Sequence, residues 1–281
     1  YGGSVLVLMI SGSLLLIYEN SLKLNLYPAL LISIILISSF ILNKINWTSE
    51  VVKIKASIYQ PNLTLQQKWS TEGIKQTTDL IQEAIENGEE GEFVFFPETA
   101  LILDKEEMES FISDIENKAV KKNISLISGI IAKDVTKRHL QERFNRIEAF
   151  GSAQGSYDKV HLVPFGEYIP LRNYLGRILD IMGINLVNTL PGKSFTHLKS
   201  RKVIISPSIC YEIAFNNLVR KTAKNSNLLV TISNDTWFGS SIGPEQHLQI
   251  AQSRALEHQK SLIRATNSGI SAFISRKGKI F

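Results

Sequence analysis

Two long stretches without a charged residue limit most strongly what this chain can fold into. They run from Gly2 to Tyr18 and from Leu24 to Asn43, separated by the short polar segment Glu19–Lys23. The second stretch is close to the roughly 20 apolar residues that span a hydrocarbon core, and the first is slightly shorter. Two such stretches in tandem are typical of a transmembrane hairpin. We therefore expect membrane helices at residues 2–18 and 25–43.

These stretches have two other interpretations. They could be buried helices of a soluble domain, since a core helix can be apolar on every side. A cleaved signal peptide fits less well, because the chain has no basic start and no small-residue cleavage pattern before a mature domain. The chain begins at Tyr1 and ends at Phe281 inside a predicted strand, so we expect a fragment that is truncated at both ends.

Composition excludes several classes of function. Hydrophobic residues make up 44% of the 281 residues, which is enough for a large core, and the net charge of +5 is scattered rather than concentrated on one predicted element. We expect no nucleic-acid partner. The five histidines form no HExxH motif, so we expect neither a metal nor another cofactor. Cys210 is the only cysteine, which excludes an intrachain disulfide and makes its thiol a candidate nucleophile.

From Val51 onward the sequence alternates between short β-branched or aromatic runs and amphipathic helical segments, which predicts α/β layers. Asn46–Ser49 is the expected boundary, giving membrane helices in residues 1–45 and a catalytic domain in residues 46–281. The expected strands cover residues 51–59, 93–96, 124–131, 142–150, 203–209, 228–233, 263–266 and 270–275, and the expected helices lie within 65–87, 105–122, 211–224 and 245–258. The last two strands flank Asn267-Ser268-Gly269, a hairpin-type turn.

A carboxylate, an ammonium and a thiol each stand where a strand is expected to end. Glu98 follows Phe95-Phe96-Pro97, Lys159 follows Tyr157-Asp158, and Cys210 follows Val203–Ile209. Brought together, the carboxylate would take the thiol proton, the thiolate would attack a carbonyl carbon, and the ammonium would stabilise the oxyanion. The set predicts an acyl-transfer site.

Each of the three residues also has an ordinary structural interpretation. Cys210 precedes a predicted helix, whose free N–H groups and dipole would lower the pKa of the thiol, but a lone cysteine is often a buried structural residue. Partial desolvation behind four apolar residues would favour Glu98 as a base, yet an acid at this place is also common near a helix start. Lys159 could be a surface lysine.

Several short sequence motifs resemble those of a known family and support the interpretation of these three residues as an acyl-transfer site. Gln60-Pro61, Phe96-Pro97-Glu98, Asp158-Lys159-Val160-His161 and Cys210-Tyr211-Glu212 resemble the nitrilase superfamily, also called the carbon-nitrogen hydrolases, with its Glu-Lys-Cys triad. A second set of words is similar, more narrowly, to the apolipoprotein N-acyltransferase family: Pro164-Phe165-Gly166-Glu167-Tyr168-Ile169-Pro170, Asn234-Asp235-Thr236-Trp237-Phe238-Gly239, Glu245-Gln246-His247 and Arg264-Ala265-Thr266-Asn267-Ser268-Gly269.

The resemblance implies a fold and a role for each residue. The fold would be a nitrilase-like α-β-β-α sandwich preceded by transmembrane helices. Glu98 would be the general base, Cys210 the nucleophile that forms a thioester, and Lys159 the oxyanion donor, helped by the backbone N–H of Tyr211. Five residues would support the site or bind substrate: Glu167, Asn145, Tyr211, Glu212 and Trp69, the last on a mobile arm. Asn145 could otherwise be a satisfied edge-strand amide, and Trp69 a packing or interface residue.

The implied activity is transfer of an acyl group from a phospholipid to the N-terminal amine of the diacylglyceryl-cysteine of an apolipoprotein. The implied location is the bacterial inner membrane, spanned several times, with the catalytic domain in the periplasm, Lys23 in a cytoplasmic turn and Trp47 at the outer interface. Lys44, Lys53 and Lys55 would by themselves favour the opposite orientation. Two alternatives stay open: a membrane-tethered amidase that hydrolyses a C–N bond, and a catalytically inactive binding module.

Overall fold

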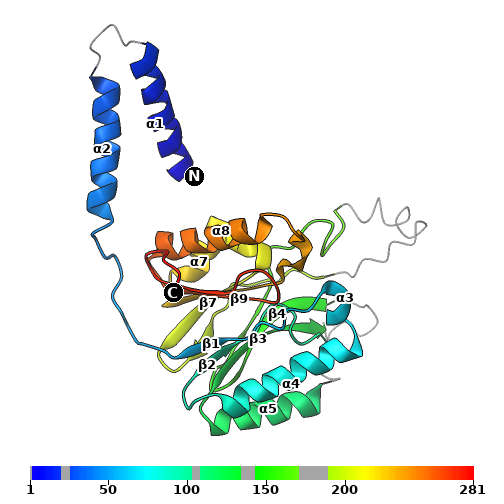
Figure 1. The fold of residues 1–281 in the computed structure, drawn as a ribbon. Helices are drawn as coiled ribbons and strands as arrows, with labels where there is room; N and C mark the ends of the chain where they lie inside the picture. The colour runs from blue at the N-terminus through cyan, green and yellow to red at the C-terminus, as the bar shows by residue number, and fades with distance from the viewer. Residues whose placement is uncertain (1, 20–25, 103–107, 134–142, 171–188) are drawn as a thin grey trace, which may run out of the picture. The chain divides into compact units, whose positions relative to one another are not determined.

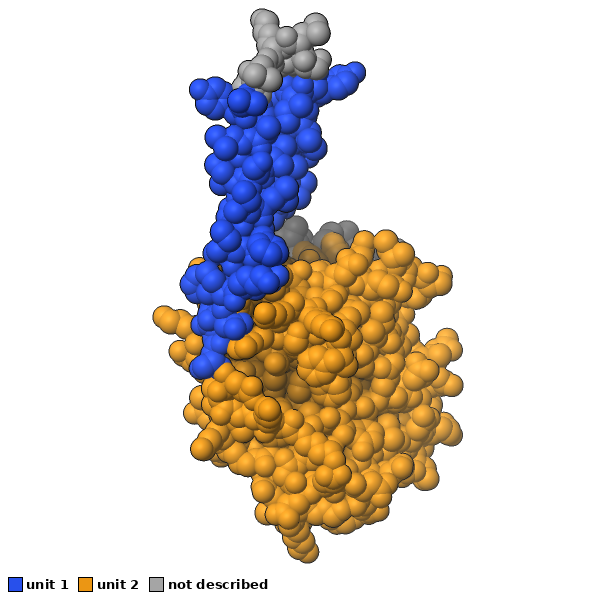
Figure 2. All heavy atoms as spheres, turned by 60° about the vertical axis from the view of Figure 1, so that its left-hand side comes forward, with its two compact units in different colours: residues 1–49 blue, residues 50–281 orange. Residues whose placement is uncertain are grey.

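In the computed structural model, ten strands among the described residues form two five-stranded sheets. The structure describes residues 2–19, 26–102, 108–133, 143–170 and 189–281. The chain divides into two compact units, residues 1–49 and residues 50–281, which Figure 2 colours separately. The assignment of residues 1–45 and 46–281 to a membrane and a catalytic domain stays a prediction.

The first sheet has the strand order β1-β2-β3-β4-β5. Its first three strands are parallel, and β4 and β5 join antiparallel. The strands are β1 (Ala56–Ile58), β2 (Phe93–Phe95), β3 (Ser125–Lys133), β4 (Arg143–Gly151) and β5 (Ser156–Asp158). Asn145 pairs with Ile131 near the end of β3, and Arg146 pairs with Asp158 at the end of β5. The start of β4 and the end of β5 therefore lie at the edge where the parallel strands end.

The second sheet has the order β10-β9-β8-β7-β6, with β7, β8 and β9 parallel and an antiparallel strand at each edge. The strands are β6 (Leu198–Ser200), β7 (Val203–Ile209), β8 (Leu228–Ser233), β9 (Leu262–Thr266) and β10 (Ala272–Ile274). The antiparallel β9–β10 pair confirms the predicted hairpin around Asn267-Ser268-Gly269.

Helices cover the outer face of each sheet, so that the layers are α-β-β-α (Figure 1). The helices α4 (Thr71–Asn87) and α5 (Glu109–Lys121) bury their apolar stripes with the first sheet around Ile81, Ile115 and Leu126. Phe93, Phe95 and Ile232 belong to the core between the sheets. The helices α7 (Asn216–Ala223) and α8 (Gly243–His258) pack on the second sheet around Val219 and Ala251. The predicted sandwich is confirmed.

Residues 1–49 contain two helices, α1 (Gly2–Glu19) and α2 (Tyr27–Leu42), that contact each other and run antiparallel (Figure 1). Most of their Leu, Ile and Val side chains are exposed. Within the described part of the chain, no helix combines the length and the apolar character needed to cross a membrane. Lys23, the predicted cytoplasmic turn residue, lies outside the described residues, so the membrane assignment stays a prediction.

Three predicted elements differ from the structure. The strand expected at residues 51–59 is only β1, and the segment 65–87 divides into α3 (Leu65–Lys68) and α4, because Ser70 caps a new helix. The helix expected at 211–224 is a 3-10 turn, η1 (Cys210–Ala214), followed by α7. The predicted starts at residues 105 and 142 lie outside the described ranges. Sequence reasoning missed β5 and β6, which have three residues each.

Candidate active site

The segment that follows β2 carries Glu98 into the interior of the unit formed by residues 50–281. This segment crosses β3 at Gly129, where an added Cβ would lie 2.4 Å from the Thr99 nitrogen, 2.5 Å from the Pro97 oxygen and 2.8 Å from the Glu98 Cα. All three atoms belong to the backbone, so no side chain could move aside to make room. Gly129 thus allows the close approach that places Glu98 over the sheet.

Four groups hold Glu98. Its Oε1 accepts from Asn145 Nδ2 at 2.7 Å and lies 3.5 Å from Lys159 Nζ, and its Oε2 accepts from the Asn234 backbone N–H at 2.9 Å. Its backbone carbonyl oxygen accepts from Lys68 Nζ at 2.7 Å. The carboxylate is therefore buried, oriented through both oxygens and paired with a cation that compensates its charge.

Lys159 follows β5 directly and is 1% exposed. Its Nζ donates to Glu167 Oε1 at 2.9 Å, and its backbone N–H donates to the Asn145 carbonyl oxygen at 2.8 Å. Burial alone would lower the pKa of Lys159, but Glu98, Cys210 and Glu167 outweigh burial and raise it. Lys159 is therefore a fixed cation between two carboxylates.

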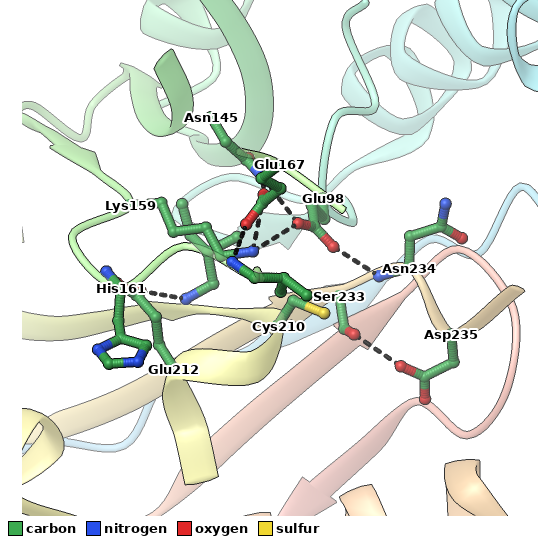
Figure 3. Close-up of polar contacts among 12 residues, drawn as sticks. Glu98, Asn145, Lys159, His161, Glu167, Cys210, Glu212, Ser233, Asn234 and Asp235 are labelled. Carbon is green, nitrogen blue, oxygen red and sulfur yellow. Dashed lines mark hydrogen bonds and ion pairs between the residues drawn. The ribbon is translucent and has the colours of Figure 1, made fainter. Parts of the chain in front are cut away.

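Asn145 and Glu167 orient Glu98 and Lys159 together. Asn145 Nδ2 also donates to Glu167 Oε1 at 3.1 Å, and Glu167 Oε2 accepts from the Val163 backbone N–H at 2.8 Å. One amide thus bridges both carboxylates, and Figure 3 shows Asn145, Glu167, Glu98 and Lys159 converging. The structure places these two predicted residues against Glu98 and Lys159.

Cys210 lies immediately after β7, with its sulfur in the same cluster as Glu98 and Lys159 (Figure 3). Its φ of +52° lies in the left-handed region, which costs a non-glycine residue on the order of 1–3 kcal/mol and persists only where neighbours enforce it. Burial raises the pKa of the Cys210 thiol to about 12, Glu98 adds to the rise, and the Lys159 ammonium opposes it. The predicted lowering of this pKa by a helix dipole is wrong, because the thiol is buried beside a carboxylate and only the five-residue η1 follows it.

The fully buried carboxylate of Glu212 accepts hydrogen bonds from the loops on both sides of the site. Its Oε1 accepts from Tyr157 Oη at 2.8 Å and from the backbone N–H groups of Val160 and His161 at 2.7 and 3.0 Å. Its Oε2 accepts from the Ile209 backbone N–H at 2.8 Å, next to Cys210. Burial raises the pKa of Glu212, although these hydrogen bonds counteract the rise. One carboxylate thereby ties the lysine loop to the cysteine turn.

The predicted residues Trp69 and Tyr211 have exposed side chains, 51% and 41% respectively. Trp69 ends α3, whose start is fixed by a capping box between Thr64 and Gln67. The Tyr211 ring packs edge-on against Phe215 with 4.8 Å between ring centroids. Neither aromatic side chain belongs to the buried polar cluster.

Sequence reasoning gave no role to two further residues that touch Glu98. Lys68 is 5% exposed, and burial lowers its pKa to about 8, partly offset by the Glu98 carboxylate. Asn234 contributes its backbone N–H, and a backbone donor cannot be predicted from a pattern of side chains. Lys68 directly precedes Trp69, a predicted site residue. This adjacency was the only sequence feature that could have indicated a role for Lys68. Among the described residues, no cluster of three or more His, Cys, Asp or Glu side chains could hold a metal ion.

The family model described as carbon-nitrogen hydrolase matches residues 55–281. The chain belongs to the carbon-nitrogen hydrolase family. Its curated relatives include proteins named apolipoprotein N-acyltransferase. The one from Pseudomonas syringae pv. tomato is 35% identical over 83% of this chain and 47% of its own length. The one from Wigglesworthia glossinidia brevipalpis is 33% identical over 99% of this chain and 56% of its own length. The chain thus spans about half the length of these relatives.

Solved structures of the nitrilase superfamily share its fold. Nit3 from Saccharomyces cerevisiae, a member of branch 10 of the nitrilase superfamily, superposes with a TM-score of 0.59 at 19% identity, covering 83% of this chain and 87% of its own. A variant of the amidase from Nesterenkonia sp. AN1, with the acetamide moiety of fluoroacetamide added covalently at its active site cysteine, gives a TM-score of 0.55 at 17% identity. That comparison covers 83% of this chain and 88% of the amidase.

Proposed function

We propose that this chain is part of an apolipoprotein N-acyltransferase, in which Cys210 takes an acyl group from a phospholipid and passes it to the N-terminal amine of the diacylglyceryl-cysteine of an apolipoprotein. The observation that carries the proposal is the cluster that the buried Glu98 and Lys159 form with the half-buried Cys210. The names of the curated relatives supply the substrate class.

The first half-reaction forms a thioester. A thiol with a pKa of about 12 is almost entirely protonated at neutral pH, so Glu98 takes the proton as the sulfur attacks the ester carbonyl carbon. Lys159 donates a hydrogen bond to the oxyanion that develops. The C–O bond then breaks, and the lysophospholipid oxygen leaves with the proton held by Glu98.

The second half-reaction uses the same groups in the opposite direction. The acceptor amine attacks the thioester carbonyl carbon, Lys159 again stabilises the oxyanion, and Glu98 accepts a proton from the nitrogen. A C–N bond forms, the C–S bond breaks, and the proton returns to the sulfur. Through both steps, hydrogen bonds from Asn145 and to Glu167 keep Glu98 and Lys159 in position.

The membrane part of the proposal rests on residues 1–49. We propose that the uncharged stretches around α1 and α2 anchor the chain in the inner membrane, with the catalytic domain in the periplasm. Their exposed Leu, Ile and Val side chains suit contact with lipid. A phospholipid donor would then be supplied directly from the bilayer.

An amidase that hydrolyses a C–N bond is the second candidate, because the fold is shared with an amidase that bears an adduct on its cysteine. The two functions are distinguished by incubating the protein with detergent-solubilised phospholipid, with and without an amine-terminated diacylglyceryl-cysteine peptide. The proposal expects lysophospholipid beyond one turnover only when the peptide is present, and none from Cys210→Ser. Sustained release of free fatty acid without the peptide, or transfer by Cys210→Ser, would contradict the proposal.

A further inference from the structure

Three of the quoted sequence motifs have had no role so far. One residue from each of them contributes to a buried cluster next to Cys210. Asp235 follows β8, His247 lies in α8, and Arg264 lies in β9. Arg264 Nη2 donates to Asp235 Oδ2, and His247 Nδ1 lies 3.0 Å from Asp235 Oδ1 and 3.2 Å from Arg264 Nη2. We refer to these three residues as the Asp235 cluster.

The Asp235 cluster is closed to solvent and electrically balanced. The side chains of Asp235 and Arg264 are both 0% exposed. Burial would raise the pKa of Asp235, but its bonds with His247, Arg264 and Ser233 outweigh burial and lower it, so the carboxylate stays charged against the guanidinium. A Cβ on Gly269 would lie 2.8 Å from Asp235 Oδ2, and Gly269 has a φ of +82°, so the β9–β10 turn seals the cluster. A buried ion pair covered by a turn is suited to a role in positioning.

The contact of the cluster with the candidate nucleophile is made by His247. Its Nε2 lies 3.1 Å from the backbone carbonyl oxygen of Cys210. A carbonyl oxygen can only accept, so Nε2 carries the hydrogen. In a neutral ring Nδ1 then accepts from Arg264, and in a protonated ring it donates to Asp235. The ring is therefore held in place in either state.

The hydrogen bond from His247 is made to Cys210, a residue with a strained backbone conformation. Cys210 has a φ of +52°, and one residue earlier the backbone is held by the bond from the Ile209 N–H to Glu212. His247 holds the carbonyl on the other side. Ser233, which donates to Asp235 Oδ1 at 2.6 Å, lies beside Cys210 and links the cluster to the surroundings of the thiol (Figure 3).

We propose that Asp235, His247 and Arg264 are positioning residues that hold Cys210 in its left-handed conformation and so aim its sulfur between Glu98 and Lys159. The inference rests on the proposed role of Cys210 as nucleophile. Without the bond from His247, Cys210 is free to relax toward an ordinary backbone conformation and carry its sulfur away from the base.

The test compares His247→Ala with His247→Gln, whose side-chain amide can donate to the same carbonyl oxygen from the same helix position. Single-turnover acylation of Cys210 is measured in detergent micelles containing a phospholipid with a fluorescent acyl chain. Misplacement by about 1 Å can cost roughly 10²-fold in rate, so we expect a loss approaching this size for His247→Ala and recovery of most of the rate in His247→Gln. Alkylation of the thiol by iodoacetamide at pH 8 should change in the opposite direction and become faster in His247→Ala, because the relaxed thiol leaves its buried site.

A matched control removes an equally buried hydrogen bond elsewhere in the second sheet layer. Thr222 accepts from Ser206 Oγ at 2.6 Å and is 0% exposed, so Thr222→Val should lower the thermal unfolding temperature without changing either rate. Parent-like acylation and alkylation in His247→Ala would overturn the inference, as would equal effects in Thr222→Val. If the parent itself is not acylated by phospholipid, the proposed function fails, while the alkylation rates still test the positioning of Cys210.

Discussion

At the scale of single residues, the site balances buried charges of both signs. Glu98 and Glu167 lie against Lys159, and Lys68 binds the backbone of Glu98. Removing one partner of such a group leaves a buried charge uncompensated, which costs far more than the pair itself contributes. The two lysines are nevertheless expected to differ in role, since only Lys159 pairs with both carboxylates.

Lys159→Arg should lose nearly as much activity as Lys159→Ala. Arginine keeps the charge, but its planar and bulkier fork does not fit a point-charge position between Glu98, Glu167 and a tetrahedral carbon. Losing an oxyanion donor costs on the order of 10²–10³ in rate, which single-turnover acylation will resolve. If Lys159→Arg acylated at close to the parent rate, Lys159 would supply only a positive field.

Lys68 should make stability depend on pH. Its pKa of about 8 in the folded protein lies below the roughly 10.4 of an unfolded lysine, so between these values the unfolded chain holds a proton that the native chain has lost. Stability therefore rises with pH in this window, and the parent should gain about 3 kcal/mol relative to Lys68→Met between pH 8 and pH 10.4.

Urea unfolding of both proteins at pH 7 and pH 10 measures this difference. Lys75→Met, at an exposed lysine of α4, is the matched control and should follow the parent at both pH values. A free-energy difference between the parent and Lys68→Met that does not change with pH would show that Lys68 is not desolvated as described.

The residues of the site were predictable where a side chain carries the chemistry. Glu98, Lys159, Cys210 and Glu167 stand in short motifs, Asn145 was implied by the resemblance, and the structure brings all five together. The Asn234 N–H was not predictable, because a backbone donor leaves no mark in the sequence. The direction of the Cys210 pKa was predicted wrongly, because burial beside Glu98 depends on the packing of two distant sheets.

At the scale of elements, the long apolar strands were easier to foresee than the short edges. Val203–Ile209 and Leu228–Ser233 are almost completely buried in the second sheet, and each begins with three successive apolar residues. The edge strands β5 and β6 have three residues each, too few to show a period. The helix expected at 211–224 is interrupted because Phe215 has an extended backbone between η1 and α7.

Gly129→Ala should displace the segment that carries Glu98. The new methyl group would meet only backbone atoms of Pro97, Glu98 and Thr99, so the segment must shift as a whole. Overpacking of this kind costs about 1–3 kcal/mol in stability, and we expect a loss of acylation larger than this destabilisation alone explains.

Thermal unfolding and single-turnover acylation test this together. Ser128→Ala, at the preceding position of β3, adds no atoms to the strand and should leave acylation unchanged. Normal acylation by Gly129→Ala would mean that the approach of the segment to β3 does not set the position of the base.

At the scale of the whole molecule, we propose a catalytic sandwich joined to a lipid anchor. The sandwich could be predicted from the strand–helix alternation and the resemblance, since each layer needs a partner to cover its apolar face. The anchor rests on two uncharged stretches with a short polar segment between them and on the exposed apolar side chains of α1 and α2.

Accessibility labelling tests the anchor and its orientation. With single cysteines introduced at Asn20 and at Ser49 in a Cys210→Ala background, an impermeant maleimide added to intact bacterial cells with a permeabilised outer membrane should label position 49 and leave position 20 unlabelled. The reason is that residues 25–43 would separate the two positions across the inner membrane. Labelling at position 20 would contradict the proposed orientation.

The most direct test of the proposed chemistry is the mass of the Cys210 peptide after the protein has met phospholipid without an acceptor amine. We expect one acyl chain on Cys210, released by hydroxylamine as a thioester is, and none in Glu98→Gln, where the base is missing. An acyl chain on another residue, no adduct in a protein that still transfers acyl groups, or an equal adduct in Glu98→Gln would contradict the assignment of Cys210 as nucleophile and Glu98 as base.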